Sequence, residues 1–382
     1  MGKTINVLLI SFVPLELKGA GTSRLLNLLV DFLSKKSNIK LEVCTLASTE
    51  EHRRFGTWEY NAFKGLPKKF LHDISPSMIR YVLRRRRNYD RLLIIGTSLT
   101  SIIVALLLKI FSRIKILQIP QLHKDFIFRD KVAMFLYKLK KWVFVYLLNF
   151  KILQPTLIVY SREEEIIVKQ FVRNIVRRPL GIDTRILDKL AEDRSKRENH
   201  NKEELTLLHV GDIHRNKFPM FAIEVMKKLK ELTNGKVKLI AIGRIHHGHY
   251  RKIKKKILEY KLEDVIQFTG IVPEDKLDKY YKNADIFVLF SASESGPFVV
   301  LEALARGLPV VATRVGLVPE LEEKGMVLGV DYGDVNGMVT KILELWRSTD
   351  LRNKLIMKTI CELTNYDVNH FLETVYQILI SE

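Results

Sequence analysis

Short apolar runs alternate with helical patterns along the first half of the chain. Residues 6–12 form an apolar run of strand length, and residues 22–35 repeat apolar side chains at helical spacing, with Thr22 or Ser23 placed to cap the helix. Further strands are predicted at residues 40–46, 92–95, 115–119 and 157–160. Strands that alternate with helices indicate parallel β-α-β units.

The same alternation starts again after a polar segment. Residues 179–183 have the composition of a turn, and residues 188–204 are rich in charged side chains, which is typical of a linker. The strands predicted beyond the linker are residues 205–210, 237–242, 265–269, 286–290 and 310–313, and the helices are residues 218–232, 252–260, 276–281 and 298–306.

This pattern predicts an α/β fold with two Rossmann-like, doubly wound domains that face each other across a cleft. The first domain is predicted at residues 1–187 and the second at residues 205–365. The sequence leaves open whether a C-terminal helix, residues 366–382, packs back on the first domain. In such sheets the ligand lies at the carboxyl ends of the strands.

The longest apolar stretch, residues 92–111, approaches the length of a membrane span. Small and polar residues interrupt it at Gly96, Thr97, Ser98, Thr100 and Ser101. A buried strand at residues 91–95, a turn and a helix at residues 99–110 explain the stretch better than a transmembrane helix does.

Composition narrows the choice of compartment and partner. The chain has 382 residues, of which 47% are hydrophobic and 28% charged, so it can bury two cores. Only two cysteines occur, Cys44 and Cys361, so a disulfide framework is not expected. The first apolar run is not followed by the small-residue cleavage site of a signal peptide, and we therefore expect a cytoplasmic protein. The net charge of +20 points to an anionic partner.

Part of that charge lies in residues 109–151, where ten Lys or Arg residues are interleaved with large aromatic side chains, and four arginines precede it at residues 84–87. Such a segment suits an anionic membrane surface, a core helix with a solvated basic face, or nucleic acid. We favour peripheral binding to the inner face of the cell membrane over nucleic acid, because no nucleic-acid-binding motif accompanies the charge.

The densest chemical signal follows the predicted strand that ends at Phe290. A loop at residues 293–296 leads to Pro297, which suits a first helical position, and Gly307 suits the position after the helix end. The free N–H groups at such a helix start favour a phosphate. Glu294 lies in the loop and Glu302 about one and a half turns inside the helix, so the two carboxylates reach different parts of one ligand. The alternative is a capped surface helix with two solvated glutamates.

The wider string resembles the donor-binding signature of glycosyltransferase family four. The matching positions are Ser291, Glu294, Glu302 to Ala305, Gly307, Pro309 to Thr313 and Pro319-Glu320. Residues 207–217 resemble the first strand and phosphate loop of that family's second domain, residues 268–270 its base-binding turn and residues 181–183 the end of its first domain. The resemblance implies a retaining enzyme of GT-B fold that needs no metal or other cofactor and uses a nucleotide-diphosphate sugar.

The resemblance also implies roles for single residues. Glu294 would contact the donor sugar near the reacting carbon, and Glu302 would hold the ribose hydroxyls. Lys217 would neutralise the leaving diphosphate. Ser295, Gly296 and Phe298 would offer backbone N–H groups to the sugar and phosphate, and Pro297, which has no N–H, lies between them.

Other implied contacts are less direct. Gly270 lies in the base-binding turn, and Gly19 and Gly21 belong to an N-terminal glycine loop that approaches donor or acceptor. His123 matches a first-domain histidine that faces the donor sugar, or it is an ordinary loop histidine.

Two positions depart from the family pattern. Leu180 stands where asparagine is common, and Asp212 where the phosphate loop usually has arginine, so that Arg215 would supply the second cation. A carboxylate that faces a diphosphate is unfavourable by roughly a few kcal/mol unless it is turned away or paired. Three histidines at residues 246–249 suit either a loop or a metal site, and a loop is the simpler interpretation.

The sequence therefore predicts a glycosyltransferase that moves a sugar from a nucleotide-diphosphate donor to a hydroxyl of a glycan or lipid-linked acceptor, in the synthesis of glycans, glycolipids or cell-surface polysaccharide. Two alternatives stay open. One is a non-catalytic binding protein of the same fold, which Asp212 would suit. The other is a GT-B sugar-nucleotide epimerase, which would consume no acceptor.

Overall fold

The computed structural model describes residues 4–15, 21–66, 74–96, 98–112, 114–120, 152–183 and 203–381. The chain divides into two compact units. Unit 1 comprises Met1–Arg178 together with Phe371–Glu382, and unit 2 comprises Pro179–His370. The predicted linker, residues 188–204, lies almost entirely outside the described residues. Each unit has its own sheet and its own buried core.

The sheet of unit 1 has the strand order β3-β4-β2-β1-β5-β6-β7-β8 within the described residues. Neighbouring strands are parallel except β3 and β4, which form an antiparallel hairpin. The strands are β1 (Ile5–Ser11), β2 (Ile39–Ala47), β3 (Glu51–Phe55), β4 (Trp58–Lys64), β5 (Arg91–Ile95), β6 (Lys115–Ile119), β7 (Thr156–Val159) and β8 (Ile175–Arg177).

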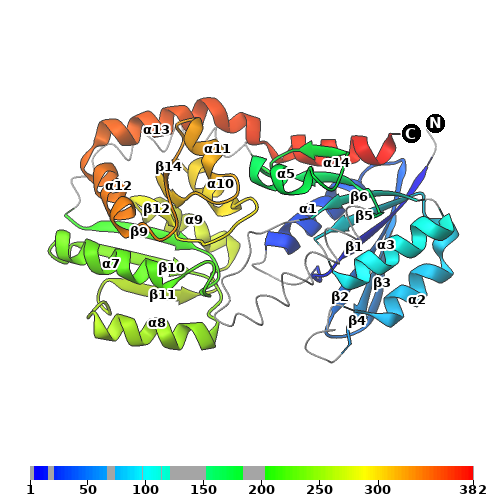
Figure 1. Ribbon diagram of the computed structural model, residues 1–382, viewed down its shortest axis with the longest axis horizontal. Helices are drawn as coiled ribbons and strands as arrows, with labels where there is room; N and C mark the ends of the chain where they lie inside the picture. The colour runs from blue at the N-terminus through cyan, green and yellow to red at the C-terminus, as the bar shows by residue number, and fades with distance from the viewer. Residues whose placement is uncertain are drawn as a thin grey trace. The chain divides into compact units, whose positions relative to one another are not determined.

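Helices cover both faces of this sheet. The helices are α1 (Gly21–Ser34), α2 (Pro76–Arg84), α3 (Leu99–Ser112), α5 (Arg162–Val168) and α14 (Val368–Ile380), with a short 3-10 turn at Arg86–Asn88. Helices α2 and α3 lie side by side in Figure 1. They bury Met78, Val82 and Leu108 against alternate strand residues such as Leu8 and Leu92. Because both faces are covered, the central strands are continuously apolar rather than alternating.

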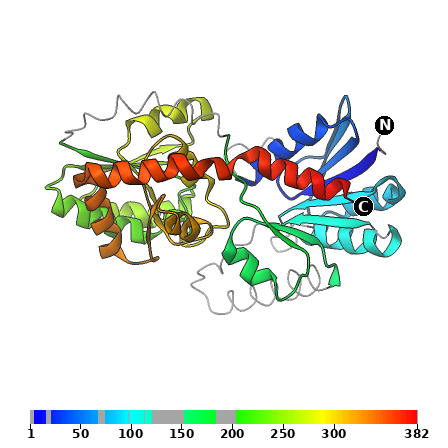
Figure 2. The same ribbon diagram turned by 90° about the horizontal axis from the view of Figure 1, so that it is seen from above.

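The C-terminal residues complete unit 1. Lys36 Nζ lies 3.0 Å from Glu373 Oε2, and Tyr376 donates a hydrogen bond of 3.0 Å to Asn38 Oδ1. Arg91 Nε donates to the carbonyl of Leu379 at 3.0 Å. Figure 2 shows α14 running beside α1. The last segment of the chain is therefore bound to its first strands and helix.

The apolar stretch at residues 92–111 is divided, as predicted, into the strand β5 and the helix α3. The turn between them contains Gly96, whose φ of +76° is a conformation that glycine adopts without strain. Among the described residues, no helix has both the length and the apolar character needed to cross a bilayer.

Some local predictions in unit 1 are wrong. Helix α1 begins at Gly21, so Thr22 and Ser23 lie in its first turn and not before it, and the Ser23 hydroxyl donates to the carbonyl of Pro14. The pattern also missed the β3–β4 hairpin, because β3 is almost wholly exposed and carries polar side chains instead of an alternating pattern.

The sheet of unit 2 is wholly parallel, with the order β11-β10-β9-β12-β13-β14. The strands are β9 (Leu205–Val210), β10 (Val237–Ile242), β11 (Ile266–Gly270), β12 (Ile286–Leu289), β13 (Val310–Thr313) and β14 (Leu328–Val330). Counted within the unit, this order is 3-2-1-4-5-6, the order of the Rossmann fold. The predicted α/β class, with two doubly wound sheets, is confirmed.

The helices of unit 2 pack on both faces of its sheet (Figure 1). They are α7 (Met220–Leu232), α8 (His247–Glu259), α9 (Glu274–Asn283), α10 (Phe298–Ala305), α11 (Val318–Glu323), α12 (Val335–Arg347) and α13 (Thr349–Glu362). Successive side chains of a strand point to opposite faces of the sheet. Leu207 therefore lies in the core cluster on one face and Leu208 in the cluster on the other.

Candidate functional site

The strand order of unit 2 places two loops next to each other. Strands β9 and β12 are hydrogen-bonded neighbours, and the chain winds outward from them in opposite directions. The loops that follow β9 and β12 therefore leave the sheet side by side at its carboxyl edge. This is the topological switch point, where doubly wound sheets bind their ligands. Both loops belong to the predicted motifs, residues 207–217 and 290–313.

Asn216 joins the two loops directly. Its backbone carbonyl accepts a hydrogen bond from Ala292 N at 2.7 Å, and its side-chain Nδ2 donates to the carbonyl of Ser293 at 3.0 Å. Asn216 is buried, so both bonds are shielded from water. The loop after β9 is thus fixed to the loop after β12.

Lys217 and Glu294 meet at this junction. The ammonium group of Lys217 lies 2.5 Å from each carboxylate oxygen of Glu294, and Ser291 Oγ donates to Glu294 Oε1 at 2.7 Å. The Glu294 side chain is only 4% exposed, whereas that of Lys217 is 31% exposed. The predicted sugar-contacting carboxylate and the predicted phosphate-binding cation therefore form one cluster that is open on the lysine side.

The loop that carries Glu294 has further supports. Thr313 Oγ1, at the end of β13, donates to the carbonyl of Ser291 at 2.6 Å. Gly316 has a φ of +56°, and a Cβ atom added there would lie 2.4 Å from the carbonyl oxygen of Ser295. Only glycine lets the chain after β13 approach so closely.

Helix α10 begins at Phe298, as predicted, but Pro297 does not take the first helical position expected for it. Pro297 is the N-cap residue and Phe298 the first helical residue, so the proline precedes the helix. Ser295 and Pro297 are buried, and Gly296 and Phe298 are partly buried. The predicted helix end is confirmed: Gly307 has a φ of +64°, and the N–H groups of Gly307 and Leu308 bond to the carbonyls of Leu304 and Ala303, respectively.

Glu302 lies on α10 in a second polar cluster. The carboxylate is largely buried, and its Oε2 accepts a hydrogen bond of 3.2 Å from the hydroxyl of Tyr281, a fully buried residue of α9. The guanidinium group of Arg306 lies 4.7 Å from the centre of the Tyr281 ring. Tyr281 and Arg306 thus fix the position of Glu302, and the sequence offered no signal for this support because Tyr281 lies outside the motif.

Asp212, the position that departs from the family pattern, is paired. Its Oδ1 accepts a hydrogen bond of 3.3 Å from Arg244 N, and its Oδ2 lies 3.3 Å from His246 Nε2. These contacts within the protein therefore partly compensate the negative charge of Asp212, which would otherwise disfavour phosphate binding.

The histidines at residues 246–249 do not form the loop expected. His246 is the N-cap of α8, and the helix begins at His247, five residues before the predicted start. His249 Nε2 lies 2.8 Å from the carbonyl oxygen of Phe218. Among the described residues, no group of three or more His, Cys, Asp or Glu side chains is arranged to hold a metal.

His209 is a site residue that the sequence analysis missed. It is fully buried on β9, its Nδ1 lies 3.1 Å from the carbonyl of Val288, and its Nε2 has no hydrogen-bond partner. A Cβ atom added at Gly211 would lie 3.3 Å from that nitrogen, so the ring is directed toward the loop that carries Lys217. Burial lowers the pKa of His209 to about 4 and keeps it neutral. A single histidine in an apolar strand gives no signal in the sequence.

The remaining predicted residues lie at different places. Gly270 ends β11 with a φ of +75°, and its carbonyl accepts a hydrogen bond from Gly243 N. Arg215 is exposed in the loop after β9. Gly21 is the first residue of α1 in unit 1, while Gly19 and His123 lie outside the described residues.

Residues 191–360 match the family model described as glycosyl transferases group 1. Unit 2 is a group 1 glycosyl transferase domain. The family resemblance inferred from its motifs is confirmed, and the Lys217–Glu294 cluster lies at the switch point of this domain.

A curated relative of this group 1 domain is the sulfoquinovosyl transferase SQD2 of Arabidopsis thaliana. It is 32% identical over 180 residues, which are 46% of this chain and 33% of the relative. The chain thus matches less than half the length of this relative and of a second one, N-acetyl-alpha-D-glucosaminyl L-malate synthase of Bacillus anthracis.

Two solved structures share the fold over nearly the whole chain. Sucrose-phosphate synthase from Thermosynechococcus elongatus gives a TM-score of 0.73 at 17% identity and covers 98% of both chains. HepE from Anabaena, in complex with UDP and glucose, gives 0.71 at 16% identity and covers 98% of this chain and 99% of HepE. At these identities the similarity shows the GT-B fold alone.

Proposed function

We propose that the protein is a retaining, metal-independent glycosyltransferase that moves a sugar from a nucleotide-diphosphate donor to a hydroxyl of a glycan or lipid-linked acceptor. The observation that carries the proposal is the pairing of Lys217 with Glu294 at the switch point of a group 1 domain. A cation and a carboxylate in contact offer charge for a diphosphate and hydrogen-bond acceptors for a sugar in one place.

Lys217 supplies the charge that the leaving diphosphate needs. Its ammonium group is partly exposed, whereas the carboxylate behind it is buried and held by Ser291. A phosphate that enters the site would share Lys217 with Glu294, and the N-terminus of α10 would add its partial positive charge. Charge stabilisation of this kind acts most strongly when negative charge develops on the leaving group.

Glu294 and Glu302 would hold the two ends of the donor. Glu294 accepts hydrogen bonds from the sugar hydroxyls near the reacting carbon, and Glu302 accepts them from the ribose hydroxyls. Catalysis then rests on positioning and on phosphate stabilisation, with no protein base strictly required. The complex of the structural neighbour HepE with UDP and glucose supports a donor of this class.

A transfer assay tests the proposal. The protein is incubated with UDP-, GDP- and ADP-sugars and with glycan and lipid-linked acceptors in the presence of EDTA, and the product is analysed by NMR. The expected product carries the sugar in the anomeric configuration of the donor. A product of inverted configuration, or activity that EDTA abolishes, contradicts the proposed mechanism.

The same assay separates the two alternatives. A donor that is epimerised without consumption of acceptor identifies an epimerase. Donor binding without any turnover identifies a non-catalytic binding protein. Lys254→Ala, which removes an exposed lysine of α8, serves as the control for substitutions of Lys217 in this assay.

We also propose that unit 1 binds an anionic membrane surface. Most of the basic and aromatic segment at residues 109–151 lies outside the described residues. Its first residues support the proposal, because Ile110 and Phe111 at the end of α3 are 69% and 61% exposed. The guanidinium group of Arg86 lies 5.9 Å from the centre of the Phe111 ring. Exposed apolar side chains beside arginines suit a lipid interface.

Flotation with vesicles tests this second proposal. The protein is expected to float with vesicles that contain anionic lipid at low salt, and Phe111→Ser is expected to weaken the association. Protein that stays at the bottom of the gradient under these conditions contradicts peripheral membrane binding.

A further inference from the structure

Unit 1 contains a cavity of about 290 Å³ that the proposed transfer reaction does not use. It lies at the amino ends of three parallel strands, where Asn6 of β1, Lys40 of β2 and Trp58 of β4 contribute to its lining. The turn of the β3–β4 hairpin, with Gly56, closes one side. Doubly wound sheets bind their usual ligands at the opposite, carboxyl edge. The cavity is therefore distinct from the ligand site that the fold predicts for this unit.

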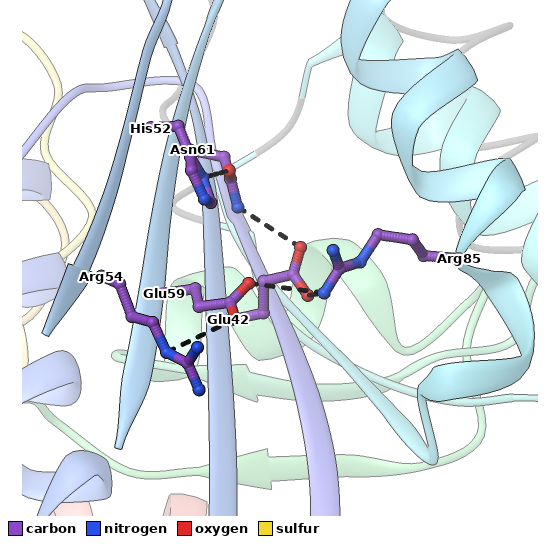
Figure 3. A network of polar contacts seen from close by, with 6 residues as sticks. All are labelled: Glu42, His52, Arg54, Glu59, Asn61 and Arg85. Atoms are coloured by element: carbon purple, nitrogen blue, oxygen red, sulfur yellow. Dashed lines mark hydrogen bonds and ion pairs between the residues drawn. The ribbon is translucent and has the colours of Figure 1, made fainter. Parts of the chain in front are cut away.

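Four of the five charged residues on the cavity wall are paired with each other, and Lys40 is the exception among the described residues (Figure 3). Arg85 Nη2 lies 3.2 Å from Glu42 Oε2 and 3.4 Å from Glu59 Oε2. Arg54 Nε lies 4.0 Å from Glu59 Oε1, on the far side of that carboxylate. A charged ligand that bound these four residues would have to disrupt this chain of ion pairs. A neutral ligand with many hydroxyl groups could bond to its members without separating them.

Behind the ion pairs, the network continues into the sheet. Asn61 Nδ2 donates to Glu42 Oε1 at 3.3 Å, and His52 contacts Asn61 Oδ1 from the neighbouring strand. Glu42 is only 8% exposed. The carboxylate is therefore fixed from behind, and its orientation does not depend on a ligand.

An aromatic side chain completes the wall. Trp58 lines the cavity and stacks on Phe55 of the same hairpin, with ring centroids 4.5 Å apart and an angle of 18° between the planes. Stacking on a second ring holds the indole in one orientation. The C–H face of a pyranose ring packs well on such an aromatic side chain, whereas its hydroxyl groups project sideways toward polar partners.

We propose that this cavity binds one neutral sugar residue, as a carbohydrate site separate from the donor site of unit 2. The volume lies at the small end of ligand pockets, which suits a monosaccharide unit. Sugar hydroxyls would donate to Glu42 and Glu59 and accept from Arg54 and Lys40. A zwitterion such as an amino acid is a poorer fit, because each of its charges would compete with an existing ion pair. The inference does not depend on the proposed transfer reaction.

The test uses saturation-transfer difference NMR to measure the binding of neutral monosaccharides to the full chain. The panel contains methyl glycosides of glucose, galactose, mannose and N-acetylglucosamine, with glucuronate as an anionic probe and glycine as a zwitterionic probe. At least one neutral glycoside is expected to bind more tightly than glucuronate and glycine. Absence of binding by every neutral glycoside overturns the proposal, as does a preference for either charged probe.

Adjacent arginines on β3 provide matched variants. Arg54 lines the cavity, whereas Arg53 pairs with Glu51 and does not line it. Arg54→Ala and Glu59→Gln are expected to weaken sugar binding on the order of tenfold, the usual effect of losing a hydrogen bond to a charged group. Arg53→Ala is expected to leave it unchanged. Equal weakening by Arg53→Ala and Arg54→Ala contradicts the assigned site.

A variant of unit 2 separates this site from the donor site. Glu294→Ala is expected to retain full binding of the methyl glycoside, because Glu294 belongs to the other unit. Loss of glycoside binding in Glu294→Ala would place the sugar at the donor site and overturn the inference. Failure of the proposed transfer activity, by contrast, would leave the binding result unaffected.

Discussion

The ammonium group of Lys217 lies 2.5 Å from both carboxylate oxygens of Glu294, although 77 residues separate the two along the chain. The contact forms because β9 and β12 are neighbours in the sheet and each residue follows one of these strands. Glu294 is buried and held by Ser291, so the lysine is the member of the pair that can turn toward a ligand.

Loss of either member of the pair is expected to reduce transfer by orders of magnitude. Lys217→Met removes the charge that stabilises the leaving diphosphate, and Glu294→Gln removes the carboxylate that receives the sugar hydroxyls. Measurement of kcat/KM in the two single variants and the double variant tests the contact. Because the residues act as one unit, the double variant should lose much less than the product of the single losses.

Near-normal turnover in both single variants would contradict the site assignment. Thermal unfolding of each variant is the control, because a variant that unfolds loses activity for a reason unrelated to catalysis. Lys254→Ala should match the wild type in both measurements.

Tyr281→Phe is expected to weaken donor binding through Glu302. The variant removes the hydroxyl that donates to Glu302 Oε2 and leaves the ring beneath Arg306 in place. Loss of one hydrogen bond of about 1 kcal/mol corresponds to an increase of about fivefold in the donor KM, with little change in kcat. Steady-state kinetics with varied donor concentration measure both constants.

The control for this variant is Tyr376→Phe, which removes a hydroxyl that bonds to Asn38 in unit 1. It should leave the donor KM unchanged. A Tyr281→Phe enzyme with an unaltered KM would show that Glu302 does not need this support for its role.

Gly316→Ala is expected to disturb the site by displacing the backbone at Ser295. The new Cβ atom would lie 2.4 Å from the carbonyl of Ser295, next to Glu294. Gly235→Ala is the matched variant, since Gly235 also has a positive φ, of +80°, but nothing within 4 Å of an added Cβ. Both variants lose about 1–2 kcal/mol of stability from the left-handed backbone, and Gly316→Ala should lose about 1–3 kcal/mol more.

Denaturant unfolding and kcat together test this comparison. Only Gly316→Ala should lower kcat, because only there does the clash displace the residues that precede α10. Equal stability and equal activity of the two variants would mean that the close approach of Gly316 to Ser295 has no part in the site.

His209 is expected to make unit 2 sensitive to acid. Its pKa is about 4 in the folded protein, mainly because of burial, against 6.5 for an ordinary histidine. Below pH 6.5 the unfolded chain binds the proton more readily, so stability falls as pH falls from about 6.5 to about 4. A shift of this size corresponds to a loss of about 3 kcal/mol.

His209→Asn keeps a donor for the carbonyl of Val288 and removes the titrating group. The slope of the unfolding free energy against pH between pH 6.5 and 4 reports how many protons the chain takes up on unfolding. In this variant that number should be smaller by up to one. His214, whose pKa is also lowered to about 4, mainly by burial, continues to contribute a slope of the same sign. An unchanged slope in His209→Asn would contradict a buried neutral histidine.

The sequence predicts the fold well where strands are buried on both faces. Residues 237–242, 310–313 and 115–119 are apolar runs whose predicted bounds agree with β10, β13 and β6. Strand β3 could not be found in this way, because it is exposed and holds its place through backbone pairing with β4. Helix α8 begins at His247 and not at Lys252, since its first turn carries little apolar periodicity.

The candidate site is predictable only in part for a similar reason. The motif identifies Glu294 and Lys217 as separate residues, but their contact depends on strand order, which the local pattern does not contain. The pairing of Asp212 with His246 and the support of Glu302 by Tyr281 join loops or helices that are far apart in the chain. Such contacts follow from tertiary packing and leave no periodic signal.

Isothermal titration of nucleotide-diphosphate sugars is the most direct test of the account, because its central claim is a donor site built on Lys217 and Glu294. UDP-, GDP- and ADP-sugars are titrated into the protein in EDTA, and the best ligand is then titrated into Lys217→Met. The account predicts that at least one donor binds and that the variant binds it at least about tenfold more weakly. Absence of binding by every donor, or equal affinity in the variant, would contradict it.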